Sequence, residues 1–310
     1  MKVIFTTPLE ENSRKLFERD NLNIVYKNKK DVTAEDLKDT EIVFGNVSPD
    51  LCNTSDTLKW VQLDSAGTDG YEKLKDSILL TNASGAYSTA ISEHMLACTL
   101  AVIKNLYRYR DQQEFHNWTN LGSVKTIGQL TVLSVGMGSI GSAYAQIMHS
   151  LGAKVYGIRR TIHDKPDYLE GLYTTDQIDE ILPQCDIVAM SLPGTEETAG
   201  LMDYDRLHHM KKGSVLINVG RGSAIVEKDL IRVMKENYLS AACLDVTEHE
   251  PLPKNNPLWE TEHVYITPHI SGRFNAEVTY DLVLEIFRKN LDHYLKKEPL
   301  EHLVDRKRGY

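Results

Sequence analysis

Three short segments in the second half of this 310-residue chain carry side chains that could act together on an organic anion. They are NVGRG at 218–222, DVTEHEP at 245–251 and TPHISG at 267–272. The planar guanidinium of Arg221 can hold a carboxylate through two hydrogen bonds. The imidazole of His269 titrates near neutral pH, so it can give or take a proton, and a neighbouring carboxylate such as Glu250 favours the protonated ring. We interpret Arg221 as an anion clamp and His269 as a general acid/base that Glu250 orients.

Each of these residues also has an ordinary structural explanation. Arg221 could neutralise a carboxylate at a strand end, Glu250 could be a solvated loop charge, and His269 could be a structural histidine. However, Arg221 directly follows the apolar run SVLINVG, and α/β proteins bind ligands at the carboxyl edge of the sheet. The three residues together favour the catalytic interpretation.

A glycine-rich loop precedes these segments in VLSVGMGSIG at 132–141. Gly136, Gly138 and Gly141 form the pattern GxGxxG between a strand-like run and a helix-like segment. Glycine permits a tight turn there and lets backbone N–H groups approach a pyrophosphate at the helix N-terminus. A turn of this kind often needs no ligand. The strand before it and the helix and strand after it nevertheless predict a dinucleotide site.

The residues at the end of the next strand-like run, KVYGI at 154–158, indicate which cofactor is preferred. Arg159, Arg160 and Thr161 stand where an NAD site usually carries Asp or Glu, which accepts a hydrogen bond from the ribose 2′-hydroxyl. Two guanidinium groups instead match the charge and geometry of a 2′-phosphate. We therefore predict NADP as the preferred cofactor, with NAD possible. A solvated arginine pair at a strand end is the alternative.

The order of the apolar runs predicts which elements position these residues. In the first hundred residues, short apolar runs alternate with polar segments that can form helices, which is typical of α/β layers. The runs are KVIF at 2–5, NIVY at 23–26, EIVFG at 41–45, WVQLD at 60–64 and ILLTN at 78–82. Residues 88–110 combine cap candidates with apolar residues at helical spacing, so we predict one long helix leading out of a first domain.

From residue 130 onward the alternation becomes more regular. The runs are LTVLSVG at 130–136, KVYGI at 154–158, DIVAMSL at 186–192, SVLINVG at 214–220, SAACLDV at 240–246 and HVYITP at 263–268. Helix-length segments separate them, which predicts a parallel sheet covered on both faces, a doubly wound domain. A last helix over 276–297 is expected to pack back onto the first domain. Its apolar positions at roughly helical spacing are Val278, Leu282, Ile286 and Leu291.

The chain resembles the D-isomer-specific 2-hydroxyacid dehydrogenase family over nearly its whole length. The matching segments, in family order, are LDSAGTDGY at 63–71, TNASGAYSTAISEHML at 81–96, VGMGSIG at 135–141, SLPGTEETAGL at 191–201, INVGRGSAIVE at 217–227, LDVTEHEPL at 244–252 and ITPHISG at 266–272. The Arg159-Arg160 pair looks like the Ser-Arg-Ser pattern of NADPH-using glyoxylate/hydroxypyruvate reductases. Formate dehydrogenases are similar in architecture but typically place Gln ahead of the histidine, where this chain has Glu250.

This resemblance implies roles for particular residues. It implies that Arg221, Glu250 and His269 are the catalytic set and that Asp245 meets the nicotinamide carboxamide. The implied cofactor site comprises Gly136, Gly138, Ser139, Ile140, Gly141, Arg159, Arg160, Thr161, Leu192, Pro193, Val219 and Asp245.

The resemblance also implies the domain organisation. The fold is α/β with two domains, in which a doubly wound Rossmann cofactor domain over residues 100–274 is inserted into a smaller flavodoxin-like substrate domain made of residues 1–99 and 275–310. Most members of the family form homodimers through the cofactor domain, so a homodimer is expected here.

A second loop of small residues could hold the substrate. The segment SAG at 65–67 would offer the backbone N–H groups of Ala66 and Gly67 to a carboxylate, because small residues allow close approach. A plain tight turn before Asp69-Gly70 explains the spacing almost as well. Val47 could line the same cleft. The predicted substrate contacts are Val47, Ala66, Gly67, Arg221 and His269.

Composition argues against several other classes of protein. The formal charge of -9 argues against a general nucleic-acid surface or a polybasic membrane surface, because both need a cationic footprint. No apolar run approaches the roughly 18 residues that span a bilayer, and Met1-Lys2 leads into VIF without a secretory signal, so a cytoplasmic protein is expected. The cysteines Cys52, Cys98, Cys185 and Cys243 are dispersed, which predicts buried, reduced thiols and no metal site.

These features predict an NADPH-preferring reductase of small 2-oxo acids such as glyoxylate or hydroxypyruvate, with D-2-hydroxy acids as products. An NAD-linked dehydrogenase of bulkier D-2-hydroxy acids is a second hypothesis. A dinucleotide-sensing binding protein, similar to corepressors that resemble this family, is a third and rests on fold analogy. Arg273, directly after TPHISG, stands where many relatives carry a small or polar residue and is predicted to reach the active site.

Overall fold

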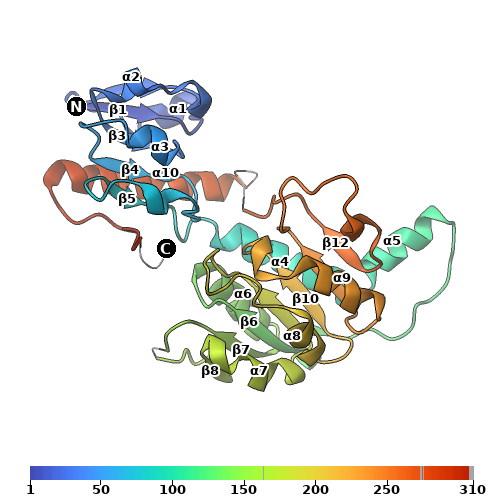
Figure 1. Ribbon diagram of the computed structural model, residues 1–310. Coiled ribbons are helices and arrows are strands. Elements are labelled where there is room, and N and C mark those ends of the chain that lie inside the picture. Colours follow the sequence, from blue (N-terminus) through green and yellow to red (C-terminus); the bar gives the residue numbers. More distant parts are fainter. Residues whose placement is uncertain (163, 273, 275, 307–310) are drawn as a thin grey trace. The chain divides into compact units, whose positions relative to one another are not determined.

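The computed structural model describes residues 1–162, 164–272, 274 and 276–306 (Figure 1). The chain forms two compact units, one made of Met1–Tyr87 and Ala276–Tyr310 and the other of Ser88–Asn275. The second unit is therefore inserted into the first. The division at Tyr87 lies earlier than the predicted boundary at residue 99, because the whole of helix α4 (Ser88–Ile103) packs with helix α6 (Ser139–Ser150) of the second unit. Arg273 lies outside the described residues.

The first unit is built on a five-stranded parallel sheet. Its strands are β1 (Lys2–Phe5), β2 (Asn23–Tyr26), β3 (Thr40–Phe44), β4 (Trp60–Gln62) and β5 (Leu79–Thr81). They are arranged in the order β2-β1-β3-β4-β5, and every pair is parallel. This is the flavodoxin-like strand order. The predicted apolar runs of the first hundred residues are thus confirmed as strands.

The C-terminal helix α10 (Glu277–Lys296) packs with this sheet. The Phe287 ring is fully buried and stacks on Phe44 with 4.1 Å between ring centroids, and Phe5 and Trp60 lie within 5.4 Å of it. The helix therefore completes the core of the first unit. The predicted apolar face was partly wrong, since Val278 and Leu282 are 45% and 38% exposed while Thr279, Val283 and Asn290 are buried.

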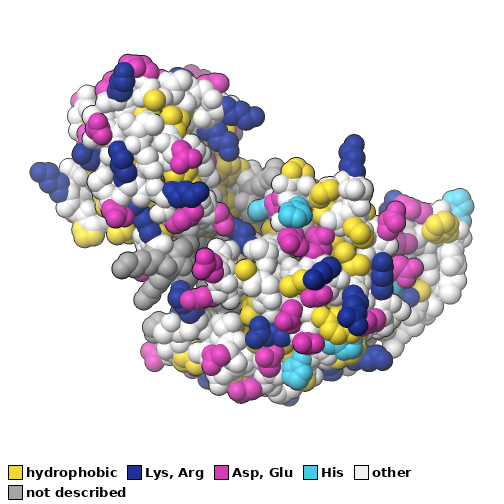
Figure 2. Space-filling model, in the orientation of Figure 1, with side chains coloured by type: hydrophobic (Ala, Val, Ile, Leu, Met, Phe, Trp, Pro, Cys, Tyr) yellow, Lys and Arg dark blue, Asp and Glu magenta, His cyan; other side chains and the backbone are white. Residues whose placement is uncertain are grey.

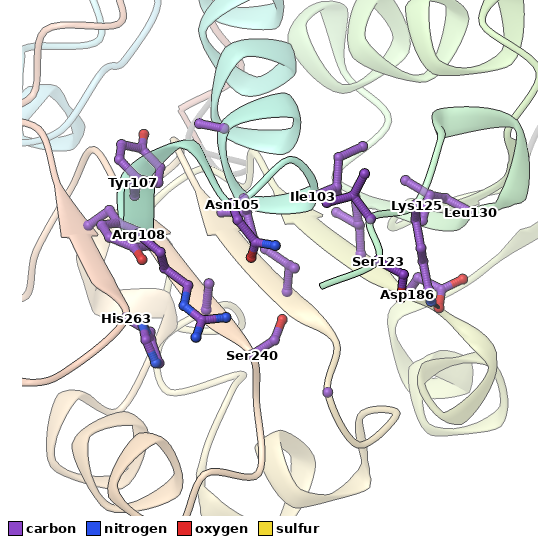
Figure 3. A pocket seen from close by; sticks show the side chains of 18 residues that line it. Ile103, Asn105, Tyr107, Arg108, Ser123, Lys125, Leu130, Asp186, Ser240 and His263 are labelled. Atoms are coloured by element: carbon purple, nitrogen blue, oxygen red, sulfur yellow. Dashed lines mark hydrogen bonds and ion pairs between the residues drawn. The ribbon is translucent and has the colours of Figure 1, made fainter. Parts of the chain in front are cut away.

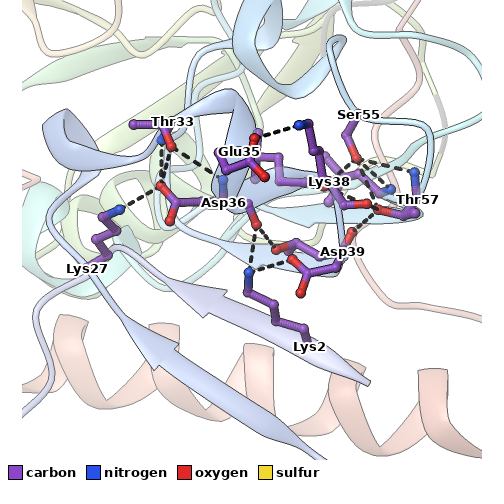
Figure 4. Close-up of polar contacts among 12 residues, drawn as sticks. Lys2, Lys27, Thr33, Glu35, Asp36, Lys38, Asp39, Ser55 and Thr57 are labelled. Atoms are coloured by element: carbon purple, nitrogen blue, oxygen red, sulfur yellow. Dashed lines mark hydrogen bonds and ion pairs between the residues drawn. The ribbon is translucent and has the colours of Figure 1, made fainter.

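Short helices connect the strands of the first unit. They are α1 (Glu11–Arg14), η1 (Lys29–Asp31), α2 (Ala34–Leu37), α3 (Pro49–Cys52) and η2 (Tyr71–Lys73). Figure 4 shows how Asp36 fixes the start of α2: its carboxylate accepts from the Thr33 backbone N–H at 2.7 Å and from Lys27 Nζ at 2.6 Å. Hydrogen bonds from Lys27 and Thr33 lower the pKa of Asp36 below its ordinary range. The same carboxylate thus links α2 to the end of β2.

The second unit is built on a seven-stranded parallel sheet. Its strands are β6 (Thr131–Val135), β7 (Lys154–Ile158), β8 (Gly171–Tyr173), β9 (Ile187–Met190), β10 (Val215–Asn218), β11 (Ala241–Leu244) and β12 (Val264–Ile266). The order β12-β11-β10-β9-β6-β7-β8 places the first strand of the unit between the second and the fourth, which is the Rossmann arrangement with one further strand. The predicted doubly wound sheet is confirmed. The strand order reverses direction between β6 and β9, and ligands of such folds bind at this switch point.

Helices and short 3-10 turns connect the strands of the second unit. They are α4 (Ser88–Ile103), α5 (Leu106–Glu114), η3 (Ile127–Gln129), α6 (Ser139–Ser150), η4 (Thr175–Gln177), α7 (Ile178–Ile181), η5 (Leu182–Gln184), α8 (Tyr204–His209), η6 (Gly222–Ala224), α9 (Glu227–Lys235) and η7 (Pro257–Glu260). Fully buried Leu133, Val188 and Leu216 mark the core between the central strands and the helices. The edge strand β8 escaped prediction because it has three residues, all half-buried.

The predicted long helix over 88–110 was wrong in one respect. It is broken after Ile103, and Asn105 adopts a left-handed conformation with φ 56° before α5 begins. Asn tolerates this region better than most residues, so the break is encoded locally. No residue of α5 is buried. The segment after it carries two strongly exposed aromatic side chains, Phe115 and Trp118.

The surface shows acidic and basic side chains interspersed on the face drawn in Figure 2. Among the described residues, no helix combines the length and the apolar character needed to cross a bilayer.

Candidate active site

The predicted acid/base pair is in direct contact. Glu250 lies in the loop after β11 and His269 in the loop after β12, so both stand beyond the carboxyl edge of the sheet. The His269 Nδ1 atom is 2.7 Å from Glu250 Oε2, and the other carboxylate oxygen accepts from the Thr247 backbone N–H at 3.2 Å. The two side chains are 44% and 37% exposed. The carboxylate therefore fixes the orientation of an imidazole that small molecules can reach.

The carboxylate of Asp245 holds the loop that carries His269. Its Oδ1 accepts from Thr267 Oγ1 at 2.6 Å and from the Ile270 N–H at 3.0 Å, and its Oδ2 accepts from both the N–H and the hydroxyl of Ser271. Burial alone raises the pKa of Asp245, but the hydrogen bonds from Ser271, Thr267 and Ile270 outweigh it and hold the pKa below its ordinary value. The residue is 2% exposed. We call this set of contacts the Asp245 clasp.

The clasp gives Asp245 a structural role beside the one that the resemblance implies. A carboxylate has about four lone-pair sites, and here four donors of the loop occupy them. The contact of Asp245 with the nicotinamide carboxamide stays a prediction. Sequence reasoning identified both Asp245 and the segment TPHISG at 267–272 but did not connect Asp245 with Thr267 and Ser271 of that segment, because the contact depends on how the two loops meet in space.

The backbone conformation of His269 also depends on the neighbouring Asp245 loop. His269 has φ 51°, in the left-handed region that non-glycine residues seldom adopt. Its N–H donates to the carbonyl oxygens of Asp245 and Thr267, each at 2.9 Å. Such a conformation persists where the surroundings fix it, and it is common at functional sites. The clasp thus holds the catalytic candidate in an otherwise unfavourable conformation.

Arg221 is brought to the same edge by β10. The buried Asn218 side chain donates to the Arg221 carbonyl at 2.9 Å and accepts from the Gly220 N–H at 3.1 Å, which fixes the turn after the strand. A Cβ on Gly222 would lie 2.0 Å from the Thr247 carbonyl carbon. Glycine at 222 therefore lets the Arg221 loop pack directly on the loop that carries Glu250.

The glycine loop after β6 has the shape of a pyrophosphate cradle. Gly138 is the N-cap of α6 and provides no side-chain cap, and a Cβ placed on it would meet nothing within 4 Å. A Cβ on Gly141 would lie 2.1 Å from the Gly136 carbonyl oxygen, so glycine permits the tight approach of helix and loop. Ser139 and Ile140 begin the helix, whose first N–H groups point toward its N-terminus. This geometry fits an anionic dinucleotide backbone.

Two neighbouring loops border the cradle. The loop after β9 carries Leu192 and Pro193, and the loop after β10 carries Val219. A Cβ on Gly220 would lie 2.5 Å from the Leu192 carbonyl oxygen, so the two loops are in contact. Leu192 and Val219 are 8% and 6% exposed. The predicted cofactor residues of these loops therefore lie together beside β6.

The arginine pair follows β7 as predicted. Arg160 is exposed and its Nη2 atom lies 2.8 Å from Glu197 Oε1, in the loop after β9. The Arg159 N–H donates to the Tyr173 carbonyl at 3.0 Å, and Thr161 is exposed. Sequence reasoning missed the pairing of Arg160 with Glu197, because the sequence of a polar loop does not show which residue its acidic side chains contact.

The predicted substrate loop lies in the first unit. The carbonyl oxygen of Ala66 accepts from the Asn82 side chain at 2.9 Å, and that of Gly67 accepts from Ser65 Oγ at 2.7 Å, so both residues are fixed in a defined turn. Val47 differs from its prediction. It is 1% exposed, belongs to the core of the unit, and uses its N–H and its carbonyl in bonds to Gly45 and Tyr71. Its surroundings give it a packing role.

The part of the chain that the structure describes contains no group of three or more His, Cys, Asp or Glu side chains arranged to hold a metal ion.

Comparison with known proteins identifies the family. The family model "D-isomer specific 2-hydroxyacid dehydrogenase, NAD binding domain" matches residues 96–271. A glyoxylate reductase of Thermofilum pendens is 31% identical over 272 residues, which cover 84% of this chain and 78% of that protein. The chain belongs to the D-isomer specific 2-hydroxyacid dehydrogenase family, whose members are NAD(P)-dependent oxidoreductases.

Solved structures of relatives share the fold of the whole chain. A D-isomer specific 2-hydroxyacid dehydrogenase family protein of Aeromonas salmonicida has a TM-score of 0.88 and 28% identity, covering 98% of this chain and 99% of its own. An NADPH-dependent glyoxylate/hydroxypyruvate reductase of Sinorhizobium meliloti, in complex with NADP and sulfate, has a TM-score of 0.84 and 25% identity, covering 100% and 99%.

The substitution Asp245→Asn tests whether the Asp245 clasp holds the His269 loop in place. In Asp245→Asn, an NH2 group replaces one carboxylate oxygen that accepts two hydrogen bonds. This group accepts none, so the loop loses its fixed position. We expect kcat to fall roughly 100-fold, the effect of misplacing a catalytic group by about 1 Å. Steady-state kinetics and far-UV circular dichroism measure the rate and the fold. Glu248→Gln, the same change at an exposed position of the neighbouring loop, serves as the matched control. Equal kcat in Asp245→Asn and Glu248→Gln would contradict the role of the clasp.

Proposed function

We propose that the protein is a reductase of small 2-oxo acids of the glyoxylate and hydroxypyruvate class, and that it prefers NADPH to NADH. The contact between His269 and Glu250, at 2.7 Å, carries this proposal. It supplies an oriented acid on the edge of the sheet that also carries Arg221 and the glycine cradle. The glyoxylate reductase activity named for the Thermofilum pendens relative supports the substrate class.

The residues of the second unit divide the chemistry among them. The nicotinamide ring, when bound, supplies the hydride that reduces the 2-oxo carbon. Arg221 holds the substrate carboxylate and polarises the carbonyl oxygen with its planar guanidinium. His269 donates the proton from Nε2 to that oxygen, because Nδ1 is paired with Glu250. The Glu250 carboxylate fixes the orientation of the imidazole ring through its contact with Nδ1. Ala66 and Gly67 stay our proposed substrate contacts in the first unit.

The proposed cofactor site uses the loops after β6, β9 and β10, in addition to the loop after β7 that carries the arginine pair. We propose that Gly136, Gly138, Ser139, Ile140 and Gly141 bind the pyrophosphate through backbone N–H groups at the start of α6. We further propose that Leu192, Pro193 and Val219 border the adenosine and nicotinamide portions. Asp245 contributes through the position of the His269 loop.

The preference for NADPH rests on Arg159, Arg160 and Thr161. The ion pair of Arg160 with Glu197 has both side chains substantially exposed, at 46% and 63%, and such pairs contribute little to stability. A 2′-phosphate offers Arg160 a doubly charged partner and displaces the carboxylate. NADH offers no such partner. Glu197 therefore weakens NADPH binding slightly without preventing it.

Two substitutions test the cofactor preference in opposite directions. Arg160→Ala removes hydrogen bonds to a charged group, which contribute about 1.5–3 kcal/mol, so the ratio of kcat/KM for NADPH to that for NADH should fall about tenfold or more. Glu197→Gln releases Arg160 and should raise the same ratio. Both ratios are measured with a panel of 2-oxo acids that includes bulkier ones. An unchanged ratio in Arg160→Ala, or turnover confined to NADH and bulky 2-oxo acids, would contradict the proposal.

Substitution of Glu250 tests the acid/base pair. In Glu250→Gln a neutral amide replaces the carboxylate that lies 2.7 Å from His269 Nδ1, and hydrogen bonds to charged groups contribute about 1.5–3 kcal/mol, so kcat/KM for 2-oxo acid reduction should fall about tenfold or more. Glu248→Gln provides the control for a lost charge in the same loop. Equal kcat/KM in Glu250→Gln and Glu248→Gln would rule out this role of Glu250.

We also propose that the protein is a homodimer. Phe115 is 82% and Trp118 is 102% exposed, and large apolar side chains exposed in this way mark contact surfaces. A second copy of the segment after α5 is the partner we propose for them. Light scattering of the intact chain should give twice the 35.1 kDa of the monomer, and Trp118→Ser should lower it. A wild-type monomer at micromolar concentration would contradict the proposal.

A further inference from the structure

A cavity with a volume of about 200 Å³ lies at the amino edge of the seven-stranded sheet. One wall includes Ile187, Val215 and Ala241, which are the first residues of β9, β10 and β11. The end of α4, the start of α5 and residues 123–125 form the other walls. The proposed catalytic residues and the glycine cradle follow the opposite ends of the strands, so this cavity is separate from them.

Apolar side chains form much of the cavity wall. The rings of Tyr107 and Tyr265 line it and stack on each other with 3.9 Å between their centroids. An apolar cavity of about 150 Å³ holds benzene, so this space has room for a ligand whose body has the size of one ring. The aliphatic residues of the wall are Val102, Ile103, Val124, Leu130, Ile187 and Val215.

One cation at the cavity has no counter-ion. Arg108 lines the cavity and, within the residues that the structure describes, its side chain forms neither an ion pair nor a hydrogen bond. The acidic residue of the wall, Asp186, is already occupied. Its Oδ1 atom lies 2.8 Å from Lys125 Nζ and 2.8 Å from Lys211 Nζ, and its Oδ2 atom accepts from the Thr131 N–H at 3.0 Å. The guanidinium of Arg108 is therefore available to an anionic ligand.

Two residues with left-handed backbones line the cavity together with Arg108. They are Asn105 and His263, with φ 56° and 63°. Non-glycine residues in this conformation cluster at ligand sites. Figure 3 shows Asn105 and Arg108 directing their side chains toward Ser240 and His263, which stand directly before β11 and β12. The Asn105 side chain does not cap α5, so its amide can donate a hydrogen bond to a ligand.

We propose that this cavity binds a small monocarboxylic acid with a compact apolar or aromatic body. The planar guanidinium of Arg108 pairs with the carboxylate through two N–H groups, and the Asn105 amide donates to one of the same oxygens. The body of the ligand occupies the space along Ile187 and Val215. Sulfate and phosphate lack such a body, and a nucleotide exceeds the volume of about 200 Å³. The ligand class thus differs from the small polar 2-oxo acids proposed for the active site.

Calorimetric titration of the intact protein with benzoate tests the proposal. Wild type should bind benzoate with a Kd below about 1 mM, which is within the binding energy per atom of small ligands. Arg108→Ala removes the charged partner and should weaken binding about tenfold or more. Arg110→Ala is the matched control, because Arg110 lies on the same exposed helix but pairs with Glu114 at 3.1 Å, and it should bind as wild type does. Far-UV circular dichroism verifies the fold of each variant.

A second variant separates this cavity from the proposed active site, because benzoate could also pair with Arg221. Arg221→Ala should keep the wild-type affinity for benzoate, and benzyl alcohol, which has the same ring without the charge, should bind at least about tenfold more weakly. In crystals soaked with 4-bromobenzoate, the anomalous signal of bromine should lie beside Ile187 and Val215.

Three results would overturn the proposal. They are no binding of benzoate by the folded wild type, equal affinity in wild type and Arg108→Ala, and a bromine signal beside Arg221 alone. None of these measurements requires turnover of a 2-oxo acid, so they decide the cavity even if the proposed function fails.

Discussion

One buried carboxylate fixes the position of the proposed acid/base residue of this protein. Asp245 stands at the end of β11 and accepts four hydrogen bonds from the loop after β12. A buried charge is costly unless donors surround it, and here the donors are the residues that flank His269. The same hydrogen bonds therefore compensate the buried charge of Asp245 and hold the proposed acid/base residue in position. The left-handed backbone of His269 is a consequence of this arrangement.

The parallel sheet brings the other parts to the same edge. Arg221, Glu250 and His269 follow three successive strands, β10, β11 and β12, which are neighbours in the sheet. Their loops can pack closely because residue 222 is glycine. A side chain at this position would collide with Thr247. The cradle after β6 lies beside the loop after β9, at the point where the strand order reverses. The proposed catalytic residues and the proposed cofactor cradle thus share one edge of one unit.

Much of this could be predicted from the sequence, because strong apolar periodicity and glycine positions are local signals. The glycine loop and both sheets follow from such signals, whereas the catalytic role of Arg221, Glu250 and His269 stays a prediction. The break at Asn105 was missed because the helical pattern continues across it. Glu197 and the partners of Asp245 were missed because they depend on which loops meet in space. The burial of Val47 in the core of the first unit was missed for the same reason, because its neighbours in the sequence give no signal of it.

Helix α4 adds an outer layer to the same network. His94 Nε2 lies 3.6 Å from Cys98 Sγ and 3.4 Å from Thr267 Oγ1, a connection that sequence spacing alone does not reveal.

The most direct test of the account is amide hydrogen exchange in the His269 loop. The N–H groups of Ile270 and Ser271 donate to a buried carboxylate, so they should exchange as slowly as the amides of strand β11 in the wild type and rapidly in Asp245→Asn. Exchange of these two amides at the rate of an exposed loop in the wild-type protein would contradict the central role of Asp245.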